Sequence, residues 1–331
     1  MMSYRKRKIA ECFGIFGVVG IVTFILHANN PIPPSLPTNT LMCAVPAVWN
    51  EGSEDLFDAI METWASRCDR LRFFIDPTDA KIPSRFPVIQ LAMVRKLNER
   101  VCKDGKPCRH IWEKVWRMWL WVARHDIQHV HWFAKIDTDS YVFVNHFKEY
   151  IDEQGMRSDD AHYFGHKLYY QTPHYISGVA TFYSREAIRR LAPQLAAMPR
   201  EYGAREDFQH GRCVDRDGAT EERTSSLCLR EVGIYAEDTV TDEGQERILL
   251  WRPQAHLEKK RLNTSKGWYW RNKPSIKTDK ECCSDKPIAF HPYKSPKELR
   301  KLHAQVTGKE PVVGTSLEAR YLERVRQKNL V

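Results

Sequence analysis

A run of apolar residues that ends in two carboxylates constrains the fold of this 331-residue chain more than any other feature. Residues 132–136 read Trp-Phe-Ala-Lys-Ile, and Asp137-Thr138-Asp139 follows directly. A buried strand that ends in this way brings both carboxylates to a sheet edge, where open α/β sheets bind their ligands. Such hard oxygen ligands suit Mg²⁺ or Mn²⁺, ions that commonly accompany a diphosphate. The alternative is a plain polar turn after a strand, and the rest of the sequence decides between the two.

Segments with strand and helix character alternate over much of the chain. Strands are predicted at residues 41–48, 71–75, 87–91, 132–136, 163–165 and 175–183. Helices are predicted at 53–64 (capped by Ser53), 107–126, 145–154 (capped by Asn145) and 184–195 (capped by Ser184). The tryptophans Trp112, Trp116 and Trp119 lie beside the apolar face of the helix at 107–126 and are predicted to be core. This alternation predicts an α/β fold with helices on a mostly parallel sheet, and the polar residues 221–226 predict a surface loop.

The N-terminus has the pattern of a membrane anchor. Four basic residues at 5–8 precede residues 9–28, an apolar stretch about one bilayer long in which Glu11 is the only charge. Basic residues before the span and none just after it predict a cytosolic N-terminus. A cleaved signal peptide is the alternative, but the residues at 26–28 form a poor cleavage site. The expected organisation is a cytosolic tail (1–8), a transmembrane signal anchor (9–28), a Pro-rich stem (29–40), a luminal domain (41–310) and a C-terminal tail (311–331).

Cysteine number and charge agree with a luminal domain. Eight of the nine cysteines lie outside the predicted span, and an even number in an oxidising compartment predicts disulfides. They are Cys43, Cys68, Cys102, Cys108, Cys213, Cys228, Cys282 and Cys283. Asn263-Thr264-Ser265 is a glycosylation sequon. Without residues 1–28, which hold four basic and one acidic side chains, the formal charge falls from +9 to +6. A basic luminal domain suits an anionic substrate such as a sugar nucleotide, and its compartment excludes nucleic acid as a partner.

Two short polar motifs are candidates for binding and proton transfer. Ser177-Gly178 is predicted in a turn between a strand and a helix, where backbone N–H groups can approach a ligand closely; a plain tight turn is the alternative. Glu206-Asp207 begins a predicted helix, where the helix dipole favours carboxylates; simple helix capping is the alternative.

Two further motifs concern sugars and metals. Trp268-Tyr269-Trp270 is an aromatic cluster of the kind that stacks on sugar faces, although most such clusters are core. His291 ends an apolar run, and a histidine that joins carboxylates from an earlier strand can complete a metal site. A lone histidine is more often structural.

Together and in this order, these segments resemble the core 1 β1,3-galactosyltransferase (glycoprotein-N-acetylgalactosamine 3-β-galactosyltransferase) branch of the fringe-like inverting β1,3-glycosyltransferases, family 31. The resemblance extends from about Leu41 to Tyr293. Its residues are Glu62–Cys68, Trp132–Val142, Ser177-Gly178 with Ser184–Ala187, Glu206-Asp207 with Gly211–Cys213, Trp268–Trp270, and Cys282–Asp285 with Phe290-His291.

The resemblance implies a GT-A fold and a Golgi (or endoplasmic reticulum–Golgi) membrane enzyme that is anchored as a type II protein. It implies metal-dependent, inverting transfer of galactose from UDP-galactose to the 3-hydroxyl of N-acetylgalactosamine on Ser or Thr of a glycoprotein. It assigns roles to individual residues: Asp139 and His291 to Mn²⁺ (or Mg²⁺), Asp137 to the ribose or the metal, Ser177 and Gly178 to the donor, Asp207 to the general base, and Glu206, Trp268, Tyr269 and Trp270 to the acceptor. Such a single displacement needs one base on the acceptor hydroxyl and charge relief on the leaving UDP.

Other functions stay open at this stage. A transferase of the same fold can use another UDP-sugar, with GlcNAc or glucose. A non-catalytic, chaperone-like homologue is a second alternative, against which Asp137, Asp139, Asp207 and His291 argue because all four acidic or metal-binding side chains are present. A lectin-like stem protein is a third. The sequence leaves a homodimer open and does not fix the disulfide pairing.

Overall fold

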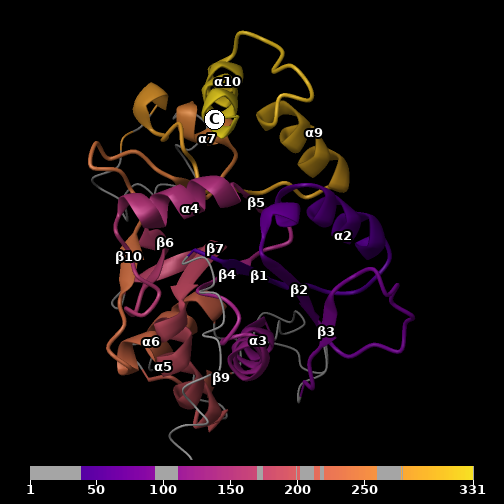
Figure 1. The fold of residues 1–331 in the computed structure, drawn as a ribbon, viewed down its shortest axis with the longest axis vertical. Coiled ribbons are helices and arrows are strands. Elements are labelled where there is room, and N and C mark those ends of the chain that lie inside the picture. Colours follow the sequence, from indigo (N-terminus) through magenta and orange to yellow (C-terminus); the bar gives the residue numbers. More distant parts are fainter. Residues whose placement is uncertain are drawn as a thin grey trace, which may run out of the picture. The chain divides into compact units, whose positions relative to one another are not determined.

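A seven-stranded sheet lies at the centre of the fold (Figure 1). The computed structural model describes residues 39–93, 111–169, 174–198, 200–201, 212–216, 220–258, 277 and 279–330. The strands of this sheet are β1 (Leu41–Pro46), β2 (Arg70–Ile75), β3 (Val88–Gln90), β4 (Trp132–Ile136), β6 (Tyr163–Leu168), β7 (Tyr175–Ser184) and β10 (Ala236–Asp238). They lie side by side in the order β10-β6-β7-β4-β1-β2-β3.

One strand runs against the others. Strands β3, β2, β1 and β4 pair in parallel, as do β6 and β10, whereas β7 is antiparallel to both β4 and β6. The predicted α/β class with a mostly parallel sheet is therefore confirmed. Because Ile136, the last residue of β4, pairs with Ala180, the first residues of β7 extend past the carboxyl end of β4. The direction of β7 thus brings Ser177 and Gly178 beside the Asp-Thr-Asp motif.

Helices cover both faces of the sheet (Figure 1). Their bounds are α2 (Ser53–Glu62), α3 (Ile111–His125), α4 (Val144–Glu153), α5 (Arg185–Ala196), α6 (Glu221–Glu231), α7 (Pro253–Leu257), α9 (Pro296–Val306) and α10 (Leu317–Asn329), with short 3₁₀ helices η1 (Trp64–Arg67) and η4 (Asp279–Glu281). Helices α2, α4, α9 and α10 pack on one face, and α3, α5 and α6 pack on the other. Alternate residues of β1 therefore face two different cores, which explains why every residue of this strand is buried.

Two small sheets accompany the large one. One contains β5 (Tyr141–Val142), β11 (Ile248–Leu249) and β12 (Ala289–Phe290), in the order β11-β12-β5. The other pairs β8 (Arg200–Glu201) with β9 (Asp215–Arg216). The strand β5 begins two residues after Asp139, so the first small sheet lies next to the Asp-Thr-Asp motif.

Several local predictions are confirmed and others are wrong. Trp112, Trp116 and Trp119 of α3 are buried, and Ser184 caps α5 by accepting a hydrogen bond from Ala187 N, both as predicted. Ser53 does not cap α2, because the N-cap is Gly52, whose φ of 81° is left-handed. Asn145 does not cap α4 either, because that helix already begins at Val144.

The predicted surface loop at 221–226 is wrong. These residues form the first half of α6, and most of them are buried, including Thr224, Ser225 and Ser226. The polar side chains misled the prediction because they pack against other polar groups of the interior: Tyr163 Oη lies 2.9 Å from Ser226 Oγ, for example.

The C-terminal segment belongs to the folded domain. Residues 311–331 were expected to be a tail, yet they contain α10, whose Tyr321 and Val325 are fully buried. Tyr321 donates a hydrogen bond to the carbonyl of Ser284 at 2.9 Å. No helix among the described residues has the length and apolarity to cross a membrane, and the predicted span at 9–28 lies outside them.

Disulfides are present, as predicted. They join Cys43 to Cys68, Cys213 to Cys228, and the neighbours Cys282 and Cys283. The first ties β1 to the end of η1, and the second ties α6 to the segment before it. Cys12, Cys102 and Cys108 lie outside the described residues.

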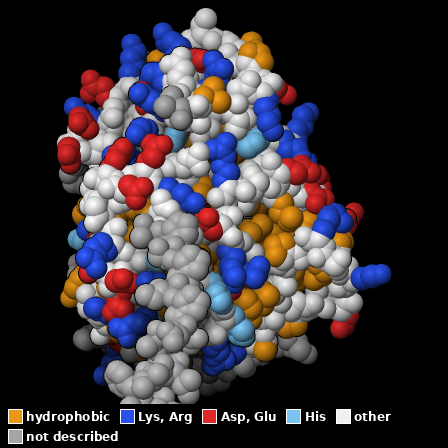
Figure 2. Space-filling model, in the orientation of Figure 1, with side chains coloured by type: hydrophobic (Ala, Val, Ile, Leu, Met, Phe, Trp, Pro, Cys, Tyr) orange, Lys and Arg blue, Asp and Glu red, His pale blue; other side chains and the backbone are white. Residues whose placement is uncertain are grey.

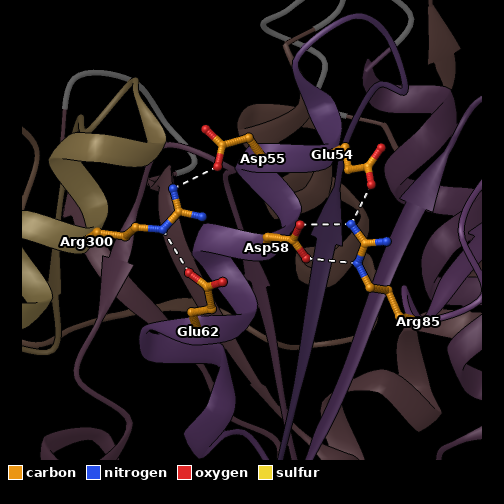
Figure 3. A network of polar contacts seen from close by, with 6 residues as sticks. All are labelled: Glu54, Asp55, Asp58, Glu62, Arg85 and Arg300. Atoms are coloured by element: carbon orange, nitrogen blue, oxygen red, sulfur yellow. Dashed lines mark hydrogen bonds and ion pairs between the residues drawn. The ribbon is translucent and has the colours of Figure 1, made fainter.

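A network of surface ion pairs surrounds α2 (Figure 3). Arg85 contacts Glu54 and Asp58, and Arg300 of α9 contacts Asp55 and Glu62. The four carboxylates come from one helix, and the two arginines approach it from segments that are far apart in the sequence. The network therefore links α2 to α9 across the surface of the domain; we call it the α2 network.

Candidate functional site

The carboxyl end of β4 brings the predicted carboxylates into a tight turn. The backbone N–H of Ser140 donates to the carbonyl of Asp137 at 3.0 Å, and Ser140 Oγ donates to the carbonyl of Val179 at 2.6 Å. Ser140 is fully buried, so this hydrogen bond anchors the turn to β7. Asp137 and Asp139 remain partly exposed at the surface of the sheet edge.

His291 lies next to Asp139, as the sequence predicted. The pairing of Phe290 in β12 with Tyr141 in β5 explains how residues 152 positions apart meet, because β5 follows Asp139 and β12 precedes His291. His291 Nε2 lies 3.4 Å from Asp139 Oδ1, and the backbone N–H of Tyr293 donates to the carbonyl of Asp139 at 2.7 Å. The small sheet thus holds the two side chains together from both directions.

A backbone contact selects the tautomer of His291 that a metal ion requires. His291 Nδ1 lies 2.9 Å from the carbonyl of Leu250, which can only accept, so this nitrogen carries the proton. In the neutral ring Nε2 is then an unprotonated acceptor that faces Asp139. This arrangement is typical of metal-binding histidines, whose other nitrogen donates to a carbonyl or carboxylate.

The two side chains also shift each other's pKa. Partial burial lowers the pKa of His291, but the hydrogen bond to Asp139 and the carbonyl of Leu250 raise it, and the net pKa lies above its ordinary value. Partial burial raises the pKa of Asp139, but the contact with His291 lowers it, and the net pKa lies below its ordinary value. Each of the two side chains therefore favours the charged form of the other.

A buried lysine joins Asp137 to α6. Lys135 Nζ lies 2.8 Å from Asp137 Oδ1 and 2.9 Å from Glu221 Oε2, and both Lys135 and Glu221 are nearly inaccessible to solvent. Burial lowers the pKa of Lys135, but the charges of Asp137, Glu221 and Glu222 more than compensate and raise it. The ammonium therefore stays charged at the centre of this group.

Gly178 leaves room for the carboxylates. It lies within β7, as does Ser177, so the predicted strand at 175–183 is confirmed and the turn predicted at these two residues is wrong. A Cβ atom at Gly178 would lie 2.7 Å from Glu222 Oε1 and 3.1 Å from Asp137 Oδ2. A side chain here would require the Glu222 carboxylate to shift, so the close approach of the carboxylates, and not a turn, favours glycine. The hydroxyl of Ser177 is buried and has no hydrogen-bond partner among the described residues.

The charge of this cluster suits a cation. Asp137, Asp139, Glu221 and Glu222 supply four carboxylates, against the single ammonium of Lys135 and the imidazole of His291. Burial and the neighbouring Glu221 raise the pKa of Glu222, although Lys135 opposes them, as expected where negative charges are crowded. Among the described residues no group of three or more His, Cys, Asp or Glu side chains is arranged to hold a metal ion. Asp139 and His291 form a pair, which fits an ion that takes its remaining ligands from water and a diphosphate.

The net positive charge does not mark the site by itself. On the face shown in Figure 2, Lys and Arg side chains are interspersed with Asp and Glu side chains. An anionic substrate is thus suggested by the chemistry of the site more than by a separate basic surface on this face.

Several predicted site residues lie outside the described residues. They are the predicted base Asp207, the predicted acceptor-binding residues Glu206, Trp268, Tyr269 and Trp270, and the sequon residue Asn263. Their roles stay predictions.

The sequence did not single out Lys135, Glu221 and Glu222. Two signals were available. A lysine in the middle of an apolar strand is rarely buried without a partner, and Thr220-Glu221-Glu222 is a typical helix start, with an N-cap residue followed by acids.

Comparisons with known proteins came from sequence and from structure. No protein-family model matches the chain. It is 26% identical over 246 residues to glycoprotein-N-acetylgalactosamine 3-beta-galactosyltransferase 1 of Xenopus laevis, a match that covers 73% of this chain and 59% of the relative. It is 27% identical over 180 residues to human chondroitin sulfate synthase 3, which covers 49% of this chain and 19% of the relative. The chain therefore spans less than two thirds of the length of either relative.

Among solved structures, the galactosyltransferase LgtC in complex with donor and acceptor sugar analogues aligns with a TM-score of 0.39 and 9% identity, over 82% of this chain and 97% of LgtC. The two sequence matches support the family resemblance found in the sequence without singling out its core 1 branch.

Proposed function

We propose that this protein is a metal-dependent glycosyltransferase that uses a UDP-sugar. The observation that carries the proposal is the pairing of Asp139 with His291, in the tautomer suited to a metal ion, at the carboxyl end of the central strand β4. The similarity to a galactosyltransferase supports the same reaction class. In this proposal the domain has a GT-A fold.

Asp139 and His291 would hold Mn²⁺ or Mg²⁺, with Asp137 beside them. When bound, the cation supplies Lewis-acid stabilisation of the diphosphate of the leaving UDP. The residues of this chain would orient the donor beside the cation. Asp137, which contacts Lys135, is available to the ribose or the metal. Gly178, which has no side chain, leaves space next to the carboxylates of Asp137 and Glu222.

The remaining requirement is a base for the acceptor hydroxyl. Asp207 is the residue that the sequence favours, with Glu206 beside it. Glu222 is a second candidate because its carboxylate lies close to Gly178, as the carboxylate of Asp137 does.

For the substrates, we propose galactose as the transferred sugar and the 3-hydroxyl of N-acetylgalactosamine on Ser or Thr of a glycoprotein as the acceptor. The name of the Xenopus relative supports this choice. Trp268, Tyr269 and Trp270 are proposed to contact the acceptor sugar. A transferase of the same fold that uses another UDP-sugar, with GlcNAc or glucose, is the second candidate, because the second relative is not named for galactose transfer.

We also propose a single-pass type II protein of the Golgi membrane, with the domain in the lumen. The basic residues at 5–8 before the apolar stretch 9–28 support this orientation. Asn263 would then be glycosylated. A glycosidase-sensitive mass shift that Asn263→Gln abolishes supports the topology, and a C-terminus open to protease from the cytosol contradicts it.

A donor screen tests the proposed function. The purified protein is incubated with UDP-galactose, UDP-GlcNAc, UDP-glucose and UDP-GalNAc, each with a GalNAc-bearing glycopeptide, in Mn²⁺ and in EDTA. Transfer from UDP-galactose that requires Mn²⁺ supports the full proposal, and transfer from another donor corrects the sugar alone. Absence of transfer and of UDP binding in every arm contradicts the proposal.

A further inference from the structure

Lys135 is a charged side chain in the interior of the protein, next to the candidate site. It lies in β4 with buried residues on both sides, and its own exposed fraction is 1%. A charged ammonium is costly to bury unless it is paired and hydrogen-bonded. Three oxygens surround its ammonium: Asp137 Oδ1 at 2.8 Å and Glu221 Oε2 at 2.9 Å form ion pairs with it, and the carbonyl of Gly178 accepts a hydrogen bond from it at 3.4 Å.

These three acceptors come from three elements that meet at the candidate site. Asp137 follows β4, Glu221 begins α6, and Gly178 lies in β7. Lys135 and Asp137 are two positions apart, so their side chains leave the strand on the same face. The ammonium contacts one oxygen of Asp137, and the other oxygen, Oδ2, lies beside Gly178, 3.1 Å from the position that a Cβ atom there would take.

We propose that Lys135 is a positioning residue for nucleotide binding. It fixes the direction in which Asp137 presents its other oxygen. Through Glu221 it also holds the first turn of α6, which carries Glu222, beside Gly178 and Asp137. The inference rests on the proposed function, since it assigns Lys135 a role in binding the UDP–metal complex through Asp137.

A purely structural role predicts a different outcome. If Lys135 only neutralises buried carboxylates, its loss reduces stability but leaves the affinity of the folded molecules unchanged. Lys135→Met alone does not separate the two roles, because it leaves Glu221 buried without a counter-charge. The double variant Lys135→Met/Glu221→Gln removes both charges of the buried pair and should fold.

The test is the affinity of full-length protein for UDP in saturating Mn²⁺, measured by calorimetry for wild type, Lys135→Met/Glu221→Gln, Lys135→Arg and Arg85→Gln. Loss of a residue that orients a ligand-holding side chain typically weakens binding by about 10- to 100-fold, which is expected for the double variant. Lys135→Arg keeps the charge but has a planar fork in place of three tetrahedral donors, so its affinity should also fall. Arg85→Gln removes a positive charge from the surface and should bind as wild type does.

Two results would overturn the inference. Wild-type affinity in the folded double variant would make Lys135 purely structural, and wild-type affinity in Lys135→Arg would make its charge sufficient without its geometry. Failure of wild type itself to bind UDP with Mn²⁺ would instead refute the proposed function, and the inference with it.

Discussion

Two groups of ion pairs in this protein use the same chemistry in different surroundings. In the α2 network, the Arg85 side chain is 47% exposed, and its partners Glu54 and Asp58 are also open to solvent. In the site, the Lys135 side chain is 2% exposed and its partner Glu221 is 3% exposed. Water and salt screen the first group strongly and the second hardly at all.

The difference shows where charge is retained for a reason other than stability. An exposed ion pair contributes little and is easily replaced. A buried pair is often no more stable than apolar side chains of similar size, so its presence calls for another explanation. In this protein Lys135 of the buried pair also contacts Asp137, and the proposed function would supply that explanation. Changes in the site should therefore affect binding and turnover, and changes in the α2 network should affect neither.

The largest effect is expected from Asp139→Ala. Loss of one of two protein ligands leaves the diphosphate charge without its neutralising ion, so transfer should fall below detection. The variant should still fold, because Asp139 is partly exposed. Activity is measured as UDP release, and folding by circular dichroism. Near-normal turnover, or full wild-type activity in EDTA, would contradict the metal assignment.

The next largest effect should identify the base. Asp207→Asn and Glu222→Gln each remove a proton acceptor and keep the shape of the side chain, and general-base catalysis typically contributes about 10²- to 10⁴-fold. We expect Asp207→Asn to lower kcat by that order while UDP binding persists. Glu206→Gln is the matched control.

The alternative outcome is equally definite. A large loss in Glu222→Gln with little change in Asp207→Asn would move the base to the first turn of α6. Wild-type kcat in all three variants would refute both candidates.

A smaller, graded effect is expected from pH. In the proposed function a metal ion would bind neutral His291, and the contact with Asp139 raises the pKa of this imidazole, so a proton would compete with the ion. Below this pKa, Mn²⁺ affinity should fall by up to about tenfold for each pH unit, and above it affinity should level off. Titrations of Mn²⁺ between pH 5 and 8 in the presence of UDP measure this. An affinity independent of pH would remove His291 from the ligand set.

Stability separates the two groups of ion pairs directly. In Glu221→Gln, buried Lys135 loses one of its two charged partners, and unfolding free energy should fall by about 1–3 kcal/mol. Denaturant unfolding measures the change. A loss too small to detect would indicate that Asp137 alone is a sufficient partner for the buried ammonium.

The smallest effect is expected in the α2 network. Arg85→Gln and Arg300→Gln remove exposed ion pairs that are screened by solvent, so the unfolding midpoint should not change measurably. The same denaturant curves serve as the check, at low and at high salt. A clear loss at low salt that disappears at high salt would show that the network acts cooperatively.

The sequence predicted the parts of this fold that depend on apolar patterning. The strand at 132–136, the tryptophan-lined helix α3 and the cap at Ser184 follow from periodicity and capping rules. The meeting of Asp139 and His291 followed from family resemblance, because a separation of 152 residues carries no local signal.

The rest depended on contacts between polar groups. The start of α6 is polar because it packs on Lys135 and Tyr163, and hydrophobic patterning treats such a segment as a loop. Gly178 was read as a turn because glycine favours turns, whereas neighbouring carboxylates determine its presence in a strand. In both cases the information lay in residues distant in the sequence.

The close approach at Gly178 also bears on how sequences of this kind can vary. A single methyl group added at this position would meet the carboxylate of Glu222 at 2.7 Å, so residue size at 178 and acid length at 222 are tied to one another. Among descendants of a common ancestor, alanine at 178 should then occur together with the shorter aspartate at 222. A larger residue at 178 alone would require the Glu222 side chain to shift. The two positions are therefore expected to evolve as a pair, although 44 residues separate them in the chain.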